Sequence, residues 1–199
     1  MKPIYSIVLQ SFLIFISSCS HPSSPTETPV ENPEVKSKYF PLTVGNIWYY
    51  SYYNSMQEAD TTKYNEQWET FAKKPLGSKQ FYCIKRTYWI ADTIFYLDTI
   101  YYCIDRDSLL QILPNSSICV RAIFPDTGIT ALHVRWETDN ESIEGYISNR
   151  TDSTITYQFW RPGWTDSDWQ ETYKKDVGLF DTRSGWGLGS RLIRFHFVK

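Results

Sequence analysis

The chain has 199 residues, of which 42% are hydrophobic and 17% aromatic, and its net charge is −2 at pH 7. This hydrophobic content is too high for a disordered chain, and the length suits one ordinary domain. A net charge near zero excludes a broad basic surface, so nucleic acid is not expected as a partner. The many aromatic residues, together with only 2 Met, favour strands over a helical bundle.

The first 18 residues have the pattern of an export signal. Lys2 is their only charged residue, and an uncharged run of 13 residues extends from Ile4 to Ile16. That run is too short for a transmembrane helix, which needs about 20 apolar residues. The run continues into Ser17-Ser18-Cys19, and the sequence at this point resembles the bacterial lipobox.

The lipobox resemblance implies a lipoprotein. It implies cleavage before Cys19, thioether lipidation of the sulfur and acylation of the new amino group by a fatty acid such as palmitate, and two or more acyl chains give stable membrane anchoring. Because Ser20 stands where an inner-membrane-retaining Asp would stand, we expect an outer-membrane anchor, with the membrane face left open. The alternative is ordinary signal cleavage near Ser20, which would give a soluble secreted protein.

The segment after the lipobox is expected to be a tether. Ser20–Lys38 contains four prolines among Ser, Thr and Glu and has no aromatic residue, so it cannot form a core. Its root-mean-square reach is about 25 Å, and its fully stretched length is about 60 Å. We therefore expect a signal peptide at 1–18, a disordered tether at 19–38 and a β domain at 39–199.

From Lys38 onward the dominant pattern is the period-2 alternation of half-buried strands. Tyr82, Ile84, Tyr88 and Ile90, for example, share a face that only Arg86 interrupts. The expected strands are Ile47–Tyr53, Tyr64–Phe71, Gln80–Ile90, Phe95–Ile104, Leu109–Leu113, Ile118–Phe124, Ala131–Thr138, Ser142–Ser148, Thr154–Trp160, Trp169–Lys174, Val177–Asp181 and Arg191–Val198.

These short strands, separated by turn residues, indicate an all-β fold with little helix. One apolar face and one polar face per strand is typical of antiparallel pairing. The sequence therefore predicts a single antiparallel meander that forms a barrel, half-barrel or sandwich, lipocalin-like or lipoprotein-carrier-like.

Two motifs bracket the domain. Tyr39–Tyr50 reads YFPLTVGNIWYY and resembles the opening of uncharacterised outer-membrane lipoproteins of the Bacteroides group, aromatic-Pro-Leu-x-x-Gly-Asn-x-Trp-x-Tyr. A second, weaker match is Val177-Gly178-Leu179, where Asp176 replaces the Gly that usually comes first. The resemblance implies a fold and a location, and it implies no chemical activity.

Aromatic residues stand out in two places. Trp48, Tyr50 and Tyr52 share one face of the first strand, and we interpret them as core, with a ligand-facing role as the alternative. Trp160, Trp164 and Trp169 surround a Pro-Gly turn and could stack on sugar faces or grip an aromatic or peptide ligand. The alternative is a long loop that folds its own indole rings onto the barrel rim.

The sequence contains no recognisable catalytic constellation. Of three histidines, His21 falls in the tether, and His133 and His196 sit within strands on the faces opposite apolar neighbours. No nucleophile elbow, phosphate-binding loop or His-Glu-x-x-His motif is present. We expect no metal site and no cofactor.

Three cysteines follow the lipobox. A hairpin turn around Ala91–Thr93 would place Cys83 and Cys103 nearly opposite each other, and exported proteins can form disulfides. Such a bridge would stabilise the fold by about 3 kcal/mol in the loop-entropy description. Buried free thiols are the alternative, and Cys119 would remain unpaired in either case.

The sequence thus predicts a non-enzymatic, lipid-anchored envelope protein that binds a small molecule, a glycan or a protein. A cavity inside the sheet would favour a small ligand, and a filled interior with an exposed aromatic patch would favour a partner protein. The alternative is an envelope hydrolase acting on glycan or lipid, which would need two carboxylates, or His133 or His196 with a carboxylate, in one cleft.

Overall fold

The structure is a computed structural model, and it describes residues 38–53, 59–60, 62–125, 132–138 and 141–198. These residues form twelve strands and no helix, so none of them belongs to a helix long and apolar enough to span a membrane. The signal peptide, Cys19, His21 and nearly all of the tether lie outside the described residues. The strands are β1 (Ile47–Tyr53), β2 (Glu66–Leu76), β3 (Lys79–Ile90), β4 (Thr93–Asp105), β5 (Ser108–Ile112), β6 (Ile118–Ile123), β7 (His133–Glu137), β8 (Ser142–Arg150), β9 (Thr154–Trp160), β10 (Trp169–Lys174), β11 (Gly178–Ser184) and β12 (Gly189–His196).

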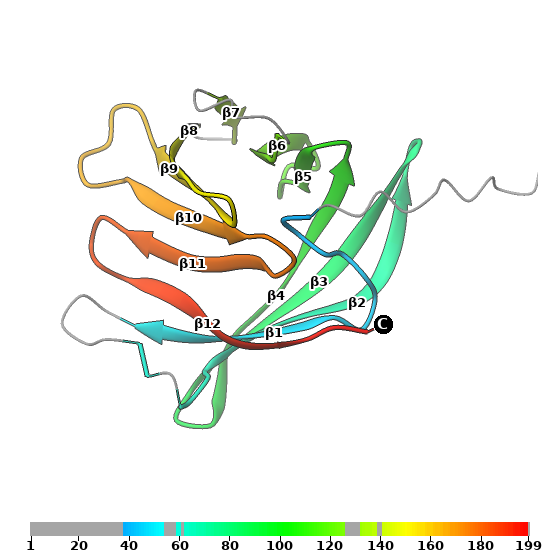
Figure 1. Ribbon diagram of the computed structural model, residues 1–199, viewed down its shortest axis with the longest axis vertical. Coiled ribbons are helices and arrows are strands. Elements are labelled where there is room, and N and C mark those ends of the chain that lie inside the picture. The colour runs from blue at the N-terminus through cyan, green and yellow to red at the C-terminus, as the bar shows by residue number, and fades with distance from the viewer. Residues whose placement is uncertain (1–37, 54–58, 61, 126–131, 139–140, 199) are drawn as a thin grey trace, which may run out of the picture. The chain divides into compact units, whose positions relative to one another are not determined.

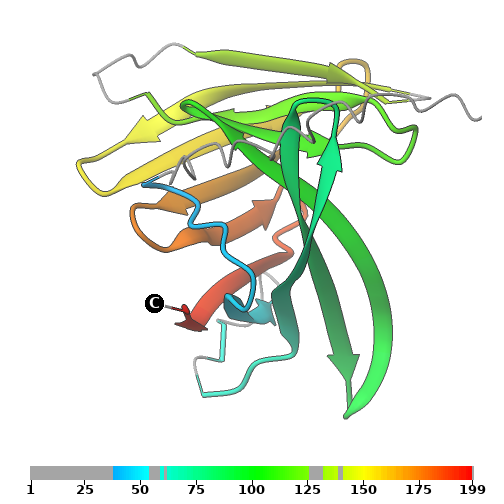
Figure 2. The ribbon, with the colours of Figure 1, turned by 90° about the vertical axis from the view of Figure 1, so that its right-hand side faces the viewer.

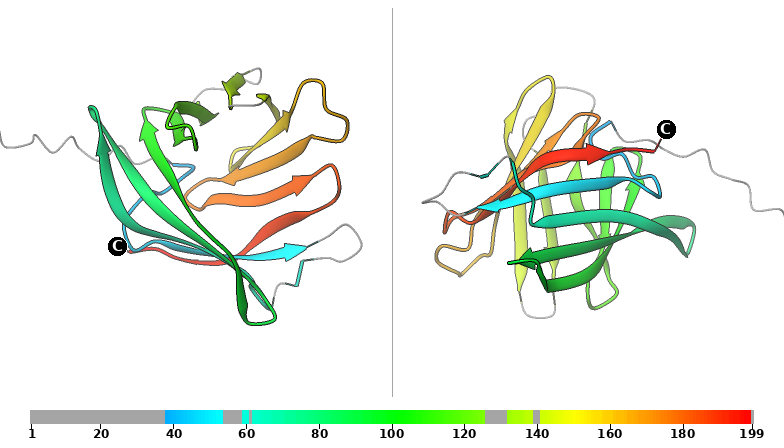
Figure 3. Two further views of the ribbon diagram at one scale, coloured as in Figure 1. Left: turned by 180° about the vertical axis from the view of Figure 1, so that it is seen from behind. Right: turned by 90° about the horizontal axis from the view of Figure 1, so that it is seen from below.

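All described strands belong to one antiparallel sheet with the order β6-β5-β4-β3-β2-β1-β12-β11-β10-β9-β8-β7. The sheet therefore consists of two six-strand meanders, β1–β6 and β7–β12, which a ladder between β1 and β12 joins. The sheet curls until β6 and β7, the last strands at its two ends, come into contact (Figures 1 and 2). The views from behind and from below show the same curvature (Figure 3). The predicted fold class is confirmed as a nearly closed barrel.

Each predicted strand is present, and the bounds of β1, β9 and β10 are those expected. The largest difference is in β2, which continues through Pro75 to Leu76 instead of ending at Phe71. A turn at Gly77, with φ +60°, lets β2 pair with β3 as far as Leu76 and Lys79. Pro75 fits there because β1 pairs with β2 only as far as Glu69, which leaves the other side of Pro75 without a ladder.

The two motifs that bracket the domain meet in the core. Trp48 is fully buried, and its Nε1 donates a hydrogen bond to the carbonyl of Val177 at 2.7 Å. The hydroxyl of Tyr50 donates to the carbonyl of Leu179 at 2.9 Å. Between them, Gly178 has φ +106°, and a Cβ on it would lie 3.2 Å from Trp48 Nε1. Alternate aromatic residues of the first motif thus hold alternate carbonyls of the second.

Other parts of the opening motif are also fixed by hydrogen bonds. Buried Asn46 donates from Nδ2 to the carbonyl of Pro41 at 2.8 Å and accepts from the backbone N–H of Val198 at 3.0 Å. Trp48 and Tyr50 are core residues as predicted, but Tyr52 is 39% exposed and contacts the ring of Tyr88. Tyr52 lies where β1 leaves the packed centre of the sheet, so the expectation that all three fill the core is wrong for this residue.

Side chains tie β6 and the residues after it to the second meander. The hydroxyl of Tyr157 on β9 accepts from the N–H of Ile123 at 2.9 Å and donates to its carbonyl at 2.7 Å. Arg150 donates from Nη2 to the carbonyl of Pro125 at 2.7 Å, and Arg121 on β6 pairs with Glu171 on β10. We call this set of contacts, which joins β6 and Pro125 to β8, β9 and β10, the β6–β7 seam. Tyr157 and Arg150 satisfy backbone groups at this edge that have no ladder partner there.

Candidate functional site: a charged cavity inside the sheet

The concave face of the sheet encloses a cavity of about 210 Å³. Both meanders contribute to its wall, because side chains at alternate positions of each strand point inward. Six charged or polar groups of the first meander line it together with three of the second: Tyr50, Glu66, Arg86, Tyr102, Gln111, Arg121, Glu171, Thr182 and Ser190. A cavity of this size holds roughly seven water molecules at about 30 Å³ each.

Arg121 and Glu171 form a buried ion pair on one side of the cavity. Their side chains are 16% and 7% exposed, and Nε and Nη2 of the guanidinium bond both carboxylate oxygens, Nε at 3.2 Å. Glu171 also accepts from Tyr173 at 2.6 Å and from Trp169 Nε1 at 3.1 Å. The guanidinium lies 5.0 Å from the ring centre of Phe159. This dense set of donors compensates the cost of burying the carboxylate.

Arg86 and Asp98 form a second pair, across β3 and β4. Nε of Arg86 donates to Oδ1 at 2.8 Å, Nη2 donates to Oδ2, and the Tyr96 hydroxyl donates to Oδ2 at 2.8 Å. Burial by itself would raise the pKa of Asp98, but the hydrogen bonds and positive charge of Arg86 outweigh it and lower the pKa. The guanidinium also lies 5.5 Å from the ring centre of Trp68.

Glu66 is held differently from the other two carboxylates. It accepts from Trp68 Nε1 at 2.7 Å and from the Ser190 hydroxyl at 2.6 Å, both neutral donors. Burial and the nearby negative charge of Glu66 raise the pKa of the Tyr50 hydroxyl. The field around Tyr50 therefore disfavours a second negative charge.

Tyr102 is a second buried tyrosine of the cavity wall. It pairs with Gln111 across β4 and β5, and Gln111 pairs with Cys119, two residues from Arg121. Burial raises the pKa of Tyr102, while Arg121 and Arg86 act in the opposite sense. The two arginines thus favour negative charge near the Tyr102 hydroxyl.

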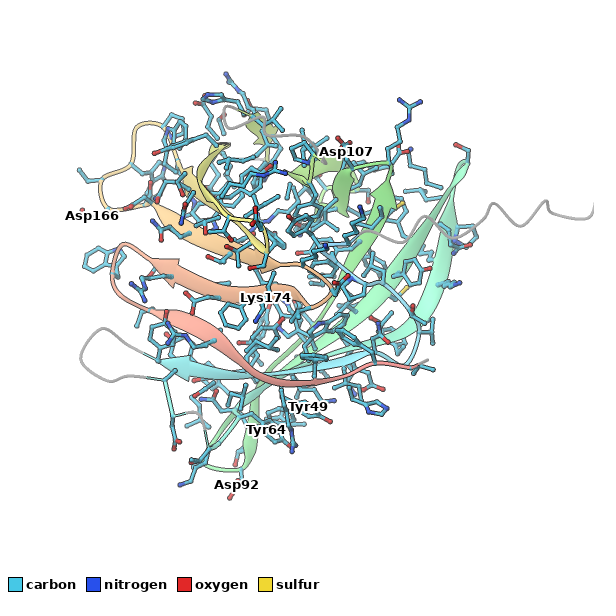
Figure 4. All side chains as sticks on the ribbon, in the orientation of Figure 1. Tyr49, Tyr64, Asp92, Asp107, Asp166 and Lys174 are labelled. Atoms are coloured by element: carbon cyan, nitrogen blue, oxygen red, sulfur yellow. The ribbon has the colours of Figure 1, made fainter. Side chains whose placement is uncertain are left out.

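The three tryptophans predicted to form a ligand site do not converge. Trp160 contacts the ring of Tyr146, and Trp164, in the loop tipped by Asp166 (Figure 4), is 64% exposed. Trp169 stacks on Phe159 with ring centres 5.1 Å apart. Trp169 is the ladder partner of Phe159, so these two side chains lie on the same face of the sheet. Trp160 follows Phe159 in β9 and therefore points to the opposite face, because successive strand residues alternate in direction.

Cys83, Cys103 and Cys119 are buried free thiols, so the structure has the second of the two arrangements that the sequence left open, and no Cys83–Cys103 disulfide is present. The predicted β3–β4 hairpin is present, with Asp92 at its tip (Figure 4). Its turn is tighter than assumed, because Ala91 and Asp92 both have positive φ, and a bulge at Tyr88/Trp89 shifts the register again. Cys83 consequently lies opposite Tyr101, two positions away from Cys103.

The described histidines contribute nothing to the cavity. His133 and His196 are both exposed, on β7 and β12. Among the residues that the structure describes, no three His, Cys, Asp or Glu side chains are placed to hold a metal ion. A histidine-assisted hydrolytic site is therefore not assembled from these residues.

The residues of the cavity were not predicted from the sequence. One signal was available, since Arg86 interrupts an otherwise apolar inward face of β3. Charged residues at inward positions of a strand indicate a polar interior. Their partners could not be identified in the same way, because Arg121 and Glu171 are 50 residues apart in sequence and meet only when the sheet curls.

Comparisons with known proteins support the fold. No family model and no curated protein matches the chain. A crystal structure from Bacteroides fragilis, of a protein whose name describes it as exported with a YmcC-like fold, superposes with a TM-score of 0.50 at 11% identity, covering 81% of this chain and 100% of that chain. A lipoprotein structure from Parabacteroides distasonis gives a TM-score of 0.48 at 13% identity, covering 80% and 99%. The chain thus has the YmcC-like fold.

Proposed function

We propose that this protein is a lipid-anchored envelope protein whose sheet interior binds a small polar ligand without transforming it. The observation that carries the proposal is the cavity of about 210 Å³ lined by Arg86, Arg121, Glu66 and Glu171. Burying charged groups costs free energy, and a barrel needing only stability would be served as well by apolar side chains. Clusters of buried charge facing a cavity are typical of binding sites.

The size and polarity of the cavity limit the ligand. Pockets for drug-sized molecules have volumes of about 300–1,000 Å³ and mostly apolar linings. This cavity is smaller and its wall is charged, so an acyl chain or another extended apolar molecule does not fit. Lipid transport, as in lipocalin-type carriers, is disfavoured on the same grounds.

Hydrolysis receives less support than binding. Glu66 and Glu171 line the same cavity, as a carboxylate mechanism would require. Glu171, however, is tied to Arg121 and accepts from Trp169 and Tyr173, so four donor groups already engage its two oxygens. A carboxylate that acts as acid, base or nucleophile must reach the substrate, and these contacts hold Glu171 in place instead.

Ligand binding can be tested by the thermal stability of the full chain in the presence of small carboxylates, amines, zwitterions and sugars. We expect at least one compound to raise the melting temperature of the wild type. The nearly isosteric Gln111→Leu variant, altered in the cavity wall, should respond less. If no compound in any class raises the melting temperature, binding in the cavity is contradicted.

The anchor requires a separate experiment. Cells grown with an alkyne fatty acid should label the wild-type protein and should not label Cys19→Ala. The three downstream cysteines serve as an internal control, because they remain in the variant. Equal labelling of the two proteins would contradict the lipobox assignment, and fractionation of labelled cells would test the outer-membrane location.

A further inference from the structure

We infer that the cavity binds a small zwitterion, with its anionic group between the guanidinium groups of Arg86 and Arg121 and its ammonium group against Glu66. The inference rests on the proposed binding function and specifies its ligand class. It comes from the charged groups of the cavity wall, which include two arginines and one glutamate, Glu66, held by neutral donors alone.

Arg86 and Arg121 offer hydrogen-bond donors to an anion. Arg86 and Arg121 each bond their carboxylate partner through Nε and Nη2, so neither pair uses Nη1. Gln111, opposite Tyr102 in the ladder, adds an amide to the same wall. Guanidinium groups are suited to carboxylates and other planar or tetrahedral anions because they present several donors in a fixed geometry.

Glu66 offers acceptors to a cation. A carboxylate has about four acceptor positions, and Glu66 uses two of them for Trp68 and Ser190. The aromatic rings of Tyr50 and Trp68 line the cavity beside it. An ammonium group next to a carboxylate and the face of an aromatic ring is stabilised by both.

The charge balance explains why a ligand with one charge fits less well. The Arg86–Asp98 and Arg121–Glu171 pairs are each neutral, which leaves the negative charge of Glu66 as the unbalanced charge of the wall. A simple anion would meet a wall of net negative charge. A simple cation would balance Glu66 but would make no use of the guanidinium groups. A zwitterion engages both the guanidinium groups and Glu66 and brings no net charge.

Titration calorimetry on the full chain with a series of ω-amino carboxylates, from glycine to 6-aminohexanoate, tests the inference. The alkyl carboxylates and alkylammonium ions of matching length are the controls. We expect one member of the series to bind at least about tenfold more tightly than either matching single-charge compound, which is the effect of one charge-assisted hydrogen bond. The chain length of the compound that binds best reports how far Glu66 lies from the two guanidinium groups.

Two variants and two matched controls locate the binding. Tyr102→Phe removes only a hydroxyl, and Glu66→Gln removes a charge while keeping an acceptor for Trp68 and Ser190. Each should weaken binding of the best zwitterion by about tenfold or more. Tyr101→Phe and Glu69→Gln change the neighbouring outward positions of the same strands and should leave the affinity unaltered.

The possible outcomes separate the inference from the proposed function. Equal affinity for the zwitterion and its matching carboxylate would contradict the inference that the ligand is a zwitterion. Unchanged binding by both cavity variants would contradict it as well. If no ω-amino carboxylate binds but another compound stabilises the wild type and not Gln111→Leu, the cavity is a binding site for a different class. If no compound in either experiment binds, both statements fail.

Discussion

At the β1–β12 junction a backbone ladder joins the two meanders from the Ile47–His196 pair to the Tyr53–Gly189 pair, whereas at the β6–β7 seam side chains make the connection. The first junction also contains the paired motifs, with Trp48 and Tyr50 bonded to carbonyls next to Gly178. The second depends on a few polar side chains that reach across the interior. The first junction thus rests on backbone hydrogen bonds and core packing, whereas the second rests on a few side chains, of which Arg121 and Glu171 also line the cavity.

The largest expected effect is on the first junction. Trp48→Ala should lower the free energy of unfolding by about 4–5 kcal/mol, because it leaves a cavity in the core and removes the hydrogen bond to Val177. Urea denaturation measures the change. Trp164→Ala, at a site 64% exposed, is the control and should change stability by less than about 0.5 kcal/mol. A similar loss in the free energy of unfolding for the two variants would contradict the view that the first junction supports the fold.

The next effect concerns the ion pair of the seam. Arg121→Met should destabilise the protein by about 3 kcal/mol, because Glu171 would keep its buried charge without a cation. The double variant Arg121→Met/Glu171→Gln should recover most of this loss, since the amide still accepts from Tyr173 and Trp169. Arg135→Met, at a surface pair 65% exposed, should cost less than about 1 kcal/mol. A double variant as unstable as the single one would contradict this account.

A smaller effect separates opening of the seam from global unfolding. Tyr157→Phe leaves the N–H and carbonyl of Ile123 without their partner and should cost about 2 kcal/mol. Burial raises the pKa of the Cys119 thiol on β6 to about 11, so this thiol should react slowly with maleimide in the wild type. In Tyr157→Phe, labelling of Cys119 should accelerate while Cys83 and Cys103 keep their rates. Equal acceleration at all three thiols would indicate global unfolding instead.

The smallest effect is in the pH dependence of the second ion pair, away from both junctions. The pKa of Asp98 is lowered in the folded state, so the unfolded state binds more protons as Asp98 titrates. The contribution of Asp98 is complete above its unfolded pKa of about 3.9 and is lost as the pH falls through the lower folded value. Asp98→Asn should therefore reduce stability at neutral pH and flatten its decline in acid, as acid-titrated urea midpoints would measure. Parallel curves for variant and wild type would contradict the assignment.

The alternation of polar and apolar residues predicted the strands because each strand has one polar and one apolar face. This pattern depends only on residues close together in the sequence. The core position of Trp48 was predicted for the same reason. The register of the β3–β4 hairpin was missed because it depends on two residues with positive φ, Ala91 and Asp92, neither of which is a glycine or asparagine. The cavity was missed because the contact between Arg121 and Glu171 requires the curvature of the whole sheet. Opposite orientations of Trp160 and Trp169 follow from strand pairing across a long loop, which the sequence does not specify.

Closure by side chains has a consequence for how the interior can vary. When every neighbouring pair of strands is bonded through the backbone, strand number and stagger determine the diameter of a barrel. Here β6 is tied across the interior to β10 by Arg121 and to β9 by Tyr157, so the lengths of these side chains help to set the distance between the two meanders. Substitutions at these two positions are therefore expected to widen or narrow the lumen while every existing ladder keeps its alignment.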